Sequence, residues 1–587
     1  MALLAGAVFM MARLAFVSAQ EGLLPSDAGF NDVKNFGAKG DGKTDDTAAL
    51  LEAISDRNGF LYLPNGTYLL SDSVSTKHPK RRVLQGQSRT GVILKLKDNA
   101  AGFDDPAKPR PVLSLYDRFM DPKSNNGQAF RNSICNLTVD VGAGNPGAVA
   151  LHYFNDNQGT VENVMLRSSD PQKRGKAGLA LVTNWPGPAL LRKVSIEGFD
   201  FGVWSTIGQY SIAFEHLSLE GQRVAGISNS HQMLSIRGLK SRNTVPAMKL
   251  AKGLVVLVDG DFTGGTAAAA IENAGSLYAR NLKIQGYRTA IQSGGKEIPG
   301  PAIDEFVSRE AVSLFPSPPK SLGLAVEESP ELPYDPPPDW IAVQGSGGKG
   351  DDTEAIQKAI DAGKSTVYFP RGTYHLNDTV HVRGTVRRII GMESTLSTGK
   401  GFEGSDKPAF RIEDGKAPVV LLERFEGGYG NHAKCYIEQA TSRTLVLRTC
   451  TLGGSYRNTV SGKLFLDDVC GAPWDFSKQQ VWARQLNPEN HGTKIVNDGG
   501  SFWCLNLKTE KAGTAVLTKG GGKSEILGGY VYFNRGNEGT VAFVNQESAL
   551  SFVAVINGAK GSLAQETRGG ETRELAKWPL LFVGATK

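Results

Sequence analysis

Short runs of alternating apolar and polar residues recur along the chain at a nearly constant interval. In the second half, leucines recur every 19–21 residues, at Leu447, Leu466, Leu486, Leu507 and Leu527. In the first half, comparable positions are 18–30 residues apart, at Leu137, Val164, Val194, Leu217, Leu239, Leu257 and Leu282. No 10–15-residue helical pattern separates these strands, and the blades of a β-propeller, the second-choice fold, repeat at about 40 residues or more. The pattern therefore predicts the stacked coils of a parallel β-helix, an all-β fold.

A long-range repeat divides the chain in two. Residues 42–74 and 348–380 align without a gap at an offset of 306 residues, and 16 of 33 positions are identical. Between them, residues 316–338 hold eight of the chain's 28 prolines, which is typical of an extended, semi-rigid linker. We therefore expect two homologous β-helix domains, at 21–315 and 339–587, joined by this linker.

Each repeated block opens with an Asp-Asp-Thr triplet, at 45–47 and at 351–353, followed by a short amphipathic pattern. Paired aspartates resemble catalytic carboxylates, but an Asp at a helix start also accepts hydrogen bonds from free N–H groups and suits the helix dipole. We interpret both pairs as helix caps, and we expect each short helix to cover the open end of its β-helix. The glycines nearby match neither a dinucleotide nor a P-loop motif, which argues against a nucleotide site.

Composition excludes several classes of protein. With 40% apolar and 21% charged residues, the chain is neither wholly disordered nor a polytopic membrane protein. Glycine, at 70 of 587 residues, favours many short strands and tight turns. A net charge of +6 gives little support to a nucleic-acid partner. The five cysteines form no CxxC motif and are expected to be buried, and we expect neither metal nor cofactor.

The first 20 residues are apolar and end in Val17-Ser18-Ala19, which is typical of a signal cleavage site, although Arg13 interrupts the run. A wrongly assigned start or a lipid-facing anchor is the alternative. No later stretch reaches 18 apolar residues, so nothing else is expected to span a membrane. We predict a signal peptide at 1–20 and a secreted, periplasmic or cell-surface protein that leaves the membrane once the signal is removed.

Two glutamates are brought together by the predicted coils. Successive coils lie about 4.8 Å apart, so residues one period apart form a column. The position three after each marker leucine reads Cys450, Val469, Glu489, Glu510 and Tyr530. An odd offset from an inward leucine points outward along a continuous strand. Glu489 and Glu510 are therefore expected side by side in an outer groove, where a polymer could lie.

This pair has the composition of a glycosidase site. Two like charges this close disfavour double ionisation, so one carboxyl is expected to stay protonated as a general acid while the other acts as a base. The alternative is a solvated surface pair that Lys508 or Lys511 neutralises.

We interpret two groups of aromatic residues near the pair differently. Trp482 and Trp503 each precede a marker leucine by four residues, and this even offset predicts an inward stack in the core. Trp474 and the run 530–533 lie near glycine-rich turns, where we expect exposed rings that stack on sugars.

The segment 481–534 resembles the C-terminal half of glycoside hydrolase family 55. The more specific motifs are RQLNPE at 484–489, LKTE at 507–510 and EILGG at 525–529. The two repeated blocks are similar to the pectate-lyase-superfamily segment that opens each helix in that family. The resemblance covers residues 30–585. It implies two tandem right-handed parallel β-helices of the pectin-lyase-like kind, each capped by a short helix, and exo-β-1,3-glucanase (laminarinase) activity.

The resemblance also implies residue roles. Glu510 in the KTE-like motif would be the acid, Glu489 would position the attacking water as base, and the reaction would invert the anomeric centre. The family places polar residues of the first helix around this water, which suggests Gln209, Gln232 and, near them, Ser228 and Ser230. The remaining substrate-binding candidates are Trp474, Arg484, Gln485 and Tyr530.

We therefore predict a monomeric, secreted glycoside hydrolase that cleaves a β-glucan polysaccharide, with β-1,3 linkages favoured, without metal. One alternative is a polysaccharide lyase that uses Lys508 or Arg484 as its base and Ca²⁺ to offset uronate charge. Tight acidic pairs outside the caps, such as Asp467 and Asp468, are few, so the sequence offers few calcium ligands. A tailspike-like or adhesin-like binding protein without catalysis is the third possibility.

Overall fold

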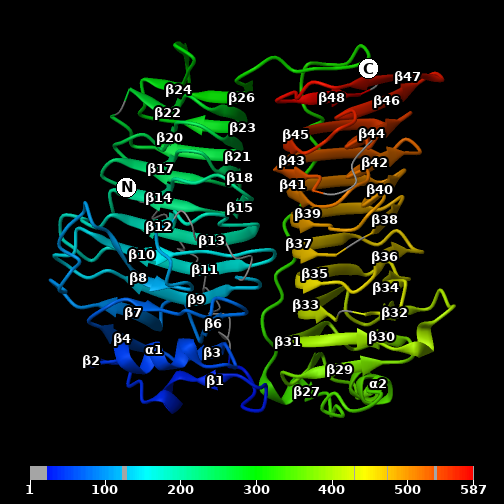
Figure 1. The fold of residues 1–587 in the computed structure, drawn as a ribbon, viewed down its shortest axis with the longest axis horizontal. Helices are drawn as coiled ribbons and strands as arrows, with labels where there is room; N and C mark the ends of the chain where they lie inside the picture. Colours follow the sequence, from blue (N-terminus) through cyan, green and yellow to red (C-terminus); the bar gives the residue numbers. More distant parts are fainter. Residues whose placement is uncertain are drawn as a thin grey trace, which may run out of the picture.

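Two parallel β-helices stand side by side in the computed structural model, which describes residues 23–121, 129–266, 268–428, 430–471, 473–534 and 539–585 (Figure 1). The strands of the first helix run from Asn31 to Val307, and those of the second run from Trp340 to Gly584. The predicted all-β architecture of two parallel β-helices is confirmed. The predicted signal peptide lies outside the described residues.

Two long sheets form the walls of the first helix. One sheet contains β1 (Asn31–Asp32), β2 (Asp41–Asp45), β3 (Phe60–Leu63), β4 (Gly66–Leu70), β6 (Val83–Gly86), β7 (Val92–Leu96), β9 (Ser133–Asp140), β11 (Thr160–Arg167), β13 (Ala189–Glu197), β15 (Ser211–Glu215), β16 (Ser218–Glu220), β18 (Met233–Arg237), β19 (Lys240–Arg242), β21 (Leu254–Thr263), β23 (Ser276–Ile284) and β26 (Ala302–Val307). The other contains β5 (Val74–Ser75), β8 (Arg110–Ser114), β10 (Ala148–His152), β12 (Ala177–Leu181), β14 (Phe201–Ser205), β17 (Ala225–Asn229), β20 (Met248–Leu250), β22 (Ala269–Asn273), β24 (Thr289–Ser293) and β25 (Lys296–Ile298).

The second helix has the same plan. Its first sheet contains β27 (Trp340–Ala342), β28 (Thr366–Tyr368), β29 (Thr373–Leu376), β31 (Arg388–Thr398), β33 (Val419–Gly427), β35 (Thr444–Thr451), β37 (Leu464–Cys470), β39 (Gln480–Asn487), β41 (Ser501–Thr509), β43 (Lys523–Tyr532), β45 (Ala549–Asn557) and β48 (Phe582–Gly584). Its second contains β30 (Val380–Gly384), β32 (Pro408–Gly415), β34 (Cys435–Gln439), β36 (Ser455–Asn458), β38 (Trp474–Ser477), β40 (Ile495–Asp498), β42 (Val516–Lys519), β44 (Phe543–Gln546), β46 (Ala564–Arg568) and β47 (Glu571–Leu575). Pairing is parallel except at the last strands of each helix, where β26, β25, β48 and β47 turn back antiparallel.

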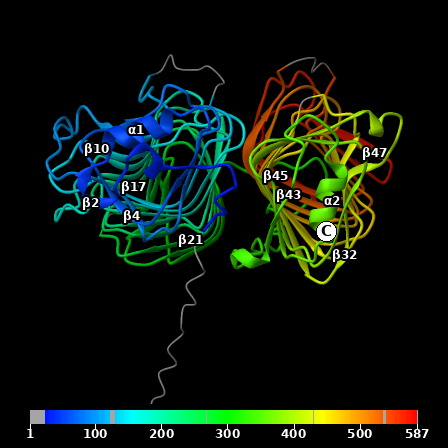
Figure 2. The same ribbon diagram turned by 90° about the horizontal axis from the view of Figure 1, so that it is seen from below.

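A short α-helix covers the first coil of each β-helix, as predicted: α1 (Thr47–Ser55) and α2 (Thr353–Asp361) (Figure 2). Leu50, Ala53 and Ile54 of α1 join the apolar core of the first β-helix, so α1 closes that end. Three short 3₁₀ helices, at Val33–Phe36, Pro337–Asp339 and Lys400–Phe402, complete the helical elements of the described residues.

The two aspartates before α1 divide the capping role. Asp45 Oδ1 accepts a hydrogen bond from the Thr47 amide at 3.1 Å, in the first turn of the helix. Asp46 instead accepts from the amides of Lys39 and Gly40, at 2.6 and 2.9 Å, and fixes the preceding turn. The structural interpretation of the pair is therefore correct, but only one of the two carboxylates caps the helix through its side chain.

A third apolar cluster lies between the two β-helices and joins them. Val256 and Tyr278 of the first helix pack there with Trp482, Trp503 and other residues of the second. The expectation that these two tryptophans stack inside the core of the second helix is wrong. Gln485 and Asn506 have positive φ values of 58° and 72°, which reverse the alternation between each tryptophan and its marker leucine.

Residues 308–339, called the strap below, connect the two helices and run between them (Figure 1). The strap contributes Leu322, Leu324, Val326 and Leu332 to the apolar cluster between the helices. Its prolines keep it extended, as the sequence indicates, but it is packed against both helices.

Candidate active site

Glu489 and Glu510 lie directly beyond the ends of adjacent strands. Leu486 of β39 pairs with Leu507 of β41, and each glutamate follows its leucine by three residues. The two positions are therefore one coil apart, as the column predicted. Both side chains are about one-fifth exposed, at 23% and 20%.

The rest of the predicted column is wrong. Val469 pairs with Leu486, so Cys450 and Val469 lead into the apolar core and not to Glu489. Tyr530 pairs with Lys508, two residues before the position expected. The reason is that the coil between β37 and β39 is shorter than the leucine spacing suggests, whereas the coil between β41 and β43 is longer.

Lys508 lies between the two glutamates. Its Nζ contacts Glu510 Oε1 at 2.6 Å and Glu489 Oε1, and it donates a hydrogen bond to Asn157 Oδ1 of the first helix at 3.0 Å. The Lys508 side chain is fully buried. Burial opposes its charge, but the two carboxylates outweigh burial and raise the pKa of Lys508. The pair is thus joined by a buried ammonium, which differs from a solvated surface pair.

Asparagine side chains hold both carboxylates in place. Asn487 Nδ2 donates to Glu489 Oε1 at 3.1 Å, and Asn534 Nδ2 donates to Glu510 Oε2 at 3.0 Å. Asn534 is itself oriented by the Lys511 amide, which donates to its Oδ1 at 3.1 Å. Fixed carboxylates of this kind suit proton transfer, because the position of each oxygen is set before a substrate arrives.

An aromatic wall with residues of both helices stands beside the pair. The ring of Tyr210 lies 5.2 Å from Lys508 Nζ, and it packs against Trp185, Tyr530 and Tyr532 with centroids 5.4–6.4 Å apart. Burial and, next, the negative charge of Glu510 raise the pKa of Tyr210. Aromatic rings next to carboxylates are common in sugar-binding sites, because a pyranose ring stacks on the face of an aromatic ring.

Gln209 and Gln232 position this wall. Trp185 Nε1 donates to Gln209 Oε1 at 3.1 Å, and the Gln209 amide donates to Gln232 Oε1 at 3.1 Å. Gln232 is fully buried, so its role is to fix the Gln209 turn. A groove of about 310 Å³ opens beside Glu489, and its lining includes Asn490 and the glycines at 427, 428, 430, 453, 454 and 471.

Several predicted substrate-binding residues lie elsewhere or are covered. Trp474 is fully buried in the core of the second helix, so the prediction that it stacks on sugar is wrong. Tyr530 is only 3% exposed and lies behind Tyr210 and Tyr532. Ser230 lines a separate groove of about 570 Å³ on the first helix, together with Ser228.

Arg484 and Gln485 are part of the contact between the helices, so neither is free to bind substrate. Arg484 is fully buried, and its Nε donates to both oxygens of Glu215 at 2.8 and 3.0 Å. Gln485 is also buried, and it accepts a hydrogen bond from Asn506, which in turn accepts one from Ser235 of the first helix at 3.0 Å.

The sequence did not reveal three residues of the site. Asn157, Trp185 and Tyr210 come from the first helix, and no pattern within one helix says which turns of the other will face it. Lys508 is part of the LKTE motif, but its place in the sequence alone could not show that its ammonium lies between the two carboxylates.

Among the described residues, one group could suggest a metal site: Glu215, His216 and Glu328. Arg237 already donates to Glu215 at 2.7 Å and to Glu328 at 2.6 Å. A guanidinium therefore takes the place that a cation would need.

Comparisons with known proteins show what this chain is similar to. A family model described as "Rhamnogalacturonase A/epimerase, pectate lyase-like" matches residues 30–249 and 343–405. A protein named "Glucan 1,3-beta-glucosidase" from Cochliobolus carbonum is 25% identical over 459 residues, which is 66% of this chain and 56% of that protein. A "Probable glucan endo-1,3-beta-glucosidase" from Arthroderma benhamiae is 21% identical over 47% of this chain and 34% of that protein.

The chain thus spans about half the length, or less, of these curated relatives. Among solved structures, that of sacteLam55A from Streptomyces sp. SirexAA-E aligns over 95% of this chain and 98% of its own, with 12% identity and a TM-score of 0.42. No helix in the described part of the chain is long and apolar enough to cross a membrane.

Proposed function

We propose that this protein is a glycoside hydrolase that cleaves β-1,3-linked glucan, as the resemblance in its sequence implies. The observation that carries the proposal is the pair of adjacent carboxylates, Glu489 and Glu510, joined by the buried ammonium of Lys508 next to an aromatic wall. The two relatives named as glucan 1,3- and endo-1,3-β-glucosidases support the choice of substrate. Secretion is part of the same proposal, because a glucan polymer is met outside the cell.

The proposed reaction moves one proton at each carboxyl group. Glu510, once protonated, gives its proton to the glycosidic oxygen as the bond to the anomeric carbon breaks. Glu489 accepts a proton from the water whose oxygen forms the new bond. One negative charge leaves Glu489 as another appears on Glu510, so the ammonium of Lys508 faces one carboxylate throughout.

The lyase alternative loses its candidate bases in this arrangement. Lys508 shares its protons with two carboxylates and an amide oxygen, and Arg484 is bound to Glu215. Neither side chain can accept a proton from a uronate without first breaking a buried ion pair.

The test begins with a reducing-sugar screen on laminarin, pectin, alginate and xylan, followed by two substitutions. Glu510→Gln keeps the size but lacks the proton, so turnover of laminarin should fall at least about 10²-fold, while a nitrophenyl glucoside should suffer less. Glu489→Gln should slow both substrates alike, because each needs the activated water. Glu354→Gln, on the exposed face of α2, is the matched control and should be unaffected.

The stereochemistry is read from the same reaction by NMR of the first product. The resemblance implies inversion, and we expect the α-anomer to appear first. Retention would instead make Glu489 a nucleophile; carboxyl groups of retaining enzymes are about 5–5.5 Å apart, against roughly 6.5–9.5 Å for inverting ones. Near-wild-type turnover in both glutamine variants would refute the proposal, and activity on none of the polymers would favour a binding protein.

A further inference from the structure

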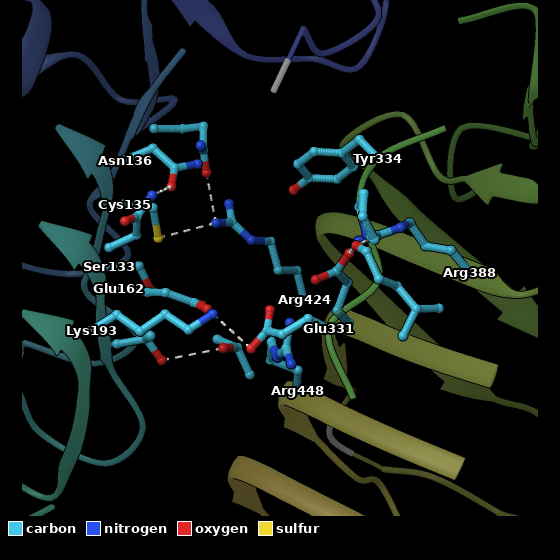
Figure 3. A pocket seen from close by; sticks show the side chains of 17 residues that line it. Ser133, Cys135, Asn136, Glu162, Lys193, Glu331, Tyr334, Arg388, Arg424 and Arg448 are labelled. Carbon is cyan, nitrogen blue, oxygen red and sulfur yellow. Dashed lines mark hydrogen bonds and ion pairs between the residues drawn. The ribbon is translucent and has the colours of Figure 1, made fainter. Parts of the chain in front are cut away.

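A second cavity, of about 260 Å³, lies between the two β-helices, and neither Glu489 nor Glu510 lines it. Figure 3 shows the first helix on one side, with Cys135, Glu162 and Lys193, and the second helix on the other, with Arg388, Arg424 and Arg448. Residues 331–334 of the strap, including Tyr334, form part of the wall. The cavity is therefore built by all three parts of the fold.

The acidic groups on this wall are already neutralised. Each pairs with a cation: Glu423 with Arg388, Glu331 with Lys193 at 2.8 Å, and Glu162 with Arg192 at 3.2 Å. Two further arginines of the wall, Arg424 and Arg448, are not part of these pairs.

Arg424 has no carboxylate within 4.0 Å among the described residues. Its Nη2 donates to the amide oxygen of Gln85 at 2.8 Å and to the sulfur of Cys135 at 3.3 Å, both neutral groups. Burial raises the pKa of the Cys135 thiol to about 11, so this sulfur supplies no negative charge near neutral pH.

Arg448 is only slightly better paired with negatively charged groups. Its one ion pair among the described residues is with Asp467 at 3.4 Å, and Asp467 also binds Arg192 at 2.9 Å. The Nε atom of Arg448 is buried and has no hydrogen-bond partner in the structure. Buried charges are normally paired, because removing an ion from water without a partner is costly.

We propose that this cavity is a binding site for a small oxyanion, a carboxylate or a phosphate, held between Arg424 and Arg448. Planar guanidinium groups bind such oxygens in a bidentate manner, and an anion here would accept hydrogen bonds from both arginines. The volume is just below the range of about 300–1,000 Å³ that is usual for ligand pockets, which suits a small anion and not an oligosaccharide.

The position of the site indicates which effect a bound anion would have on the fold. The Lys193–Glu331 pair, with side chains 38% and 50% exposed, stands at the mouth, so the cavity is reachable from solvent. An anion bound to Arg424 and Arg448 beside residues 331–334 would hold the strap to the second helix. Binding would therefore stabilise the fold in proportion to anion concentration.

The test is calorimetric titration of the whole protein with inorganic phosphate and, separately, with malonate, at constant ionic strength in chloride. We expect saturable binding of at least one, and a rise in unfolding temperature that saturates in the same range. Arg424→Gln and Arg448→Gln should each weaken binding at least tenfold. Arg383→Gln, which removes an exposed arginine paired with Asp361, should bind as the wild type does.

A preference for phosphate or for malonate identifies which oxyanion the site takes. If either variant fails to fold, the wild-type protein provides the test. Its crystals, grown with selenate, should show an anomalous peak between Arg424 and Arg448. Ordered water alone at that place, no saturable binding of either anion, or unchanged binding in both folded variants would overturn the proposal.

Discussion

At the scale of single residues, the ammonium of Lys508 determines how the two glutamates can work together. Two carboxylates this close would repel each other, but Lys508 contacts both and is itself fully buried. The expectation that like-charge repulsion alone sets their protonation left this cation out. Since a proton leaves Glu510 as another reaches Glu489 in the proposed reaction, the ammonium stabilises the single negative charge wherever it resides.

Lys508→Met should therefore be nearly as damaging as loss of a carboxylate. Without the cation, two carboxylates face each other and uptake of a proton relieves their repulsion, so we expect laminarin hydrolysis at least about 10²-fold slower and a pH–rate profile displaced to higher pH. The kcat/KM–pH profile measures this. Lys519→Met, an exposed lysine paired with Asp498, is the control; an unmoved profile in Lys508→Met would contradict the role.

Asp468 is a second residue whose surroundings have a measurable consequence. It is fully buried between the helices, where its Oδ2 accepts from Thr160 Oγ1 at 2.8 Å and its Oδ1 has no partner in the structure. Burial raises its pKa to about 8. The pKa of an aspartate in the unfolded chain is about 3.9. At pH values between the two pKa values, the folded protein keeps a proton that the unfolded chain has lost.

The folded state binds more protons in that window, so stability should fall as pH rises from about 4 to about 8. Asp468→Asn cannot titrate, and we expect its unfolding temperature to decline less than that of the wild type over the same range. Thermal unfolding at several pH values measures the difference. Asp498→Asn, an exposed site, should follow the wild type, and parallel curves for all three proteins would rule out the effect.

At the scale of elements, a buried side chain of the second helix helps to hold the strap in place. Glu525 of β43 accepts hydrogen bonds from the amides of Gly323 and Leu324, at 2.8 and 3.1 Å, and it pairs with Arg280 of the first helix at 2.7 Å. One fully buried carboxylate thus ties the strap, β43 and β23 together.

Glu525→Gln should loosen this junction. The amide keeps one acceptor oxygen but loses the charge that balances Arg280, and breaking a buried pair costs about 3–5 kcal/mol. Hydrogen exchange followed by mass spectrometry should show faster exchange in peptides around 320–326. Glu354→Gln, on the exposed face of α2, should leave exchange in the strap as it was. Unchanged protection in Glu525→Gln would show that apolar packing alone holds the strap.

At the scale of the whole molecule, docking of the two helices creates both the candidate active site and the cavity. The contact combines the apolar cluster around Trp482 and Trp503 with buried ion pairs. Glu215 of the first helix is central, since it binds Arg484 of the second helix at 2.8 Å and Arg237 of its own at 2.7 Å.

This geometry predicts unequal effects of removing either partner. Glu215→Gln leaves the buried Arg484 without its carboxylate, although Arg237 keeps Glu328 and Asp259, and it should lower the free energy of unfolding by about 3–5 kcal/mol. Arg484→Met leaves Glu215 with Arg237 and should cost clearly less. Urea denaturation of both variants and of the double variant measures this order. Equal costs, or a greater cost for Arg484→Met, would contradict the central place of Glu215.

The sequence by itself determined the coils, the doubling of the fold and the adjacency of Glu489 and Glu510. These features follow from local periodicity: a parallel coil repeats its inward leucines, and residues at equal distances from paired positions stack on neighbouring coils. The short helices at 47–55 and 353–361 could be predicted for the same reason, because a cap and an amphipathic turn are local signals.

Only the tertiary structure decided which side chains face the other helix. Positive φ at Gln485 and Asn506 reverses the alternation of inward and outward residues, so Trp482, Trp503 and Arg484 enter the contact between the helices and Leu486 and Leu507 enter the core. Tyr210 and Asn157 reach Glu510 and Lys508 from more than 270 residues away in the chain. Such contacts depend on how two finished surfaces fit, and no spacing within either helix contains that information.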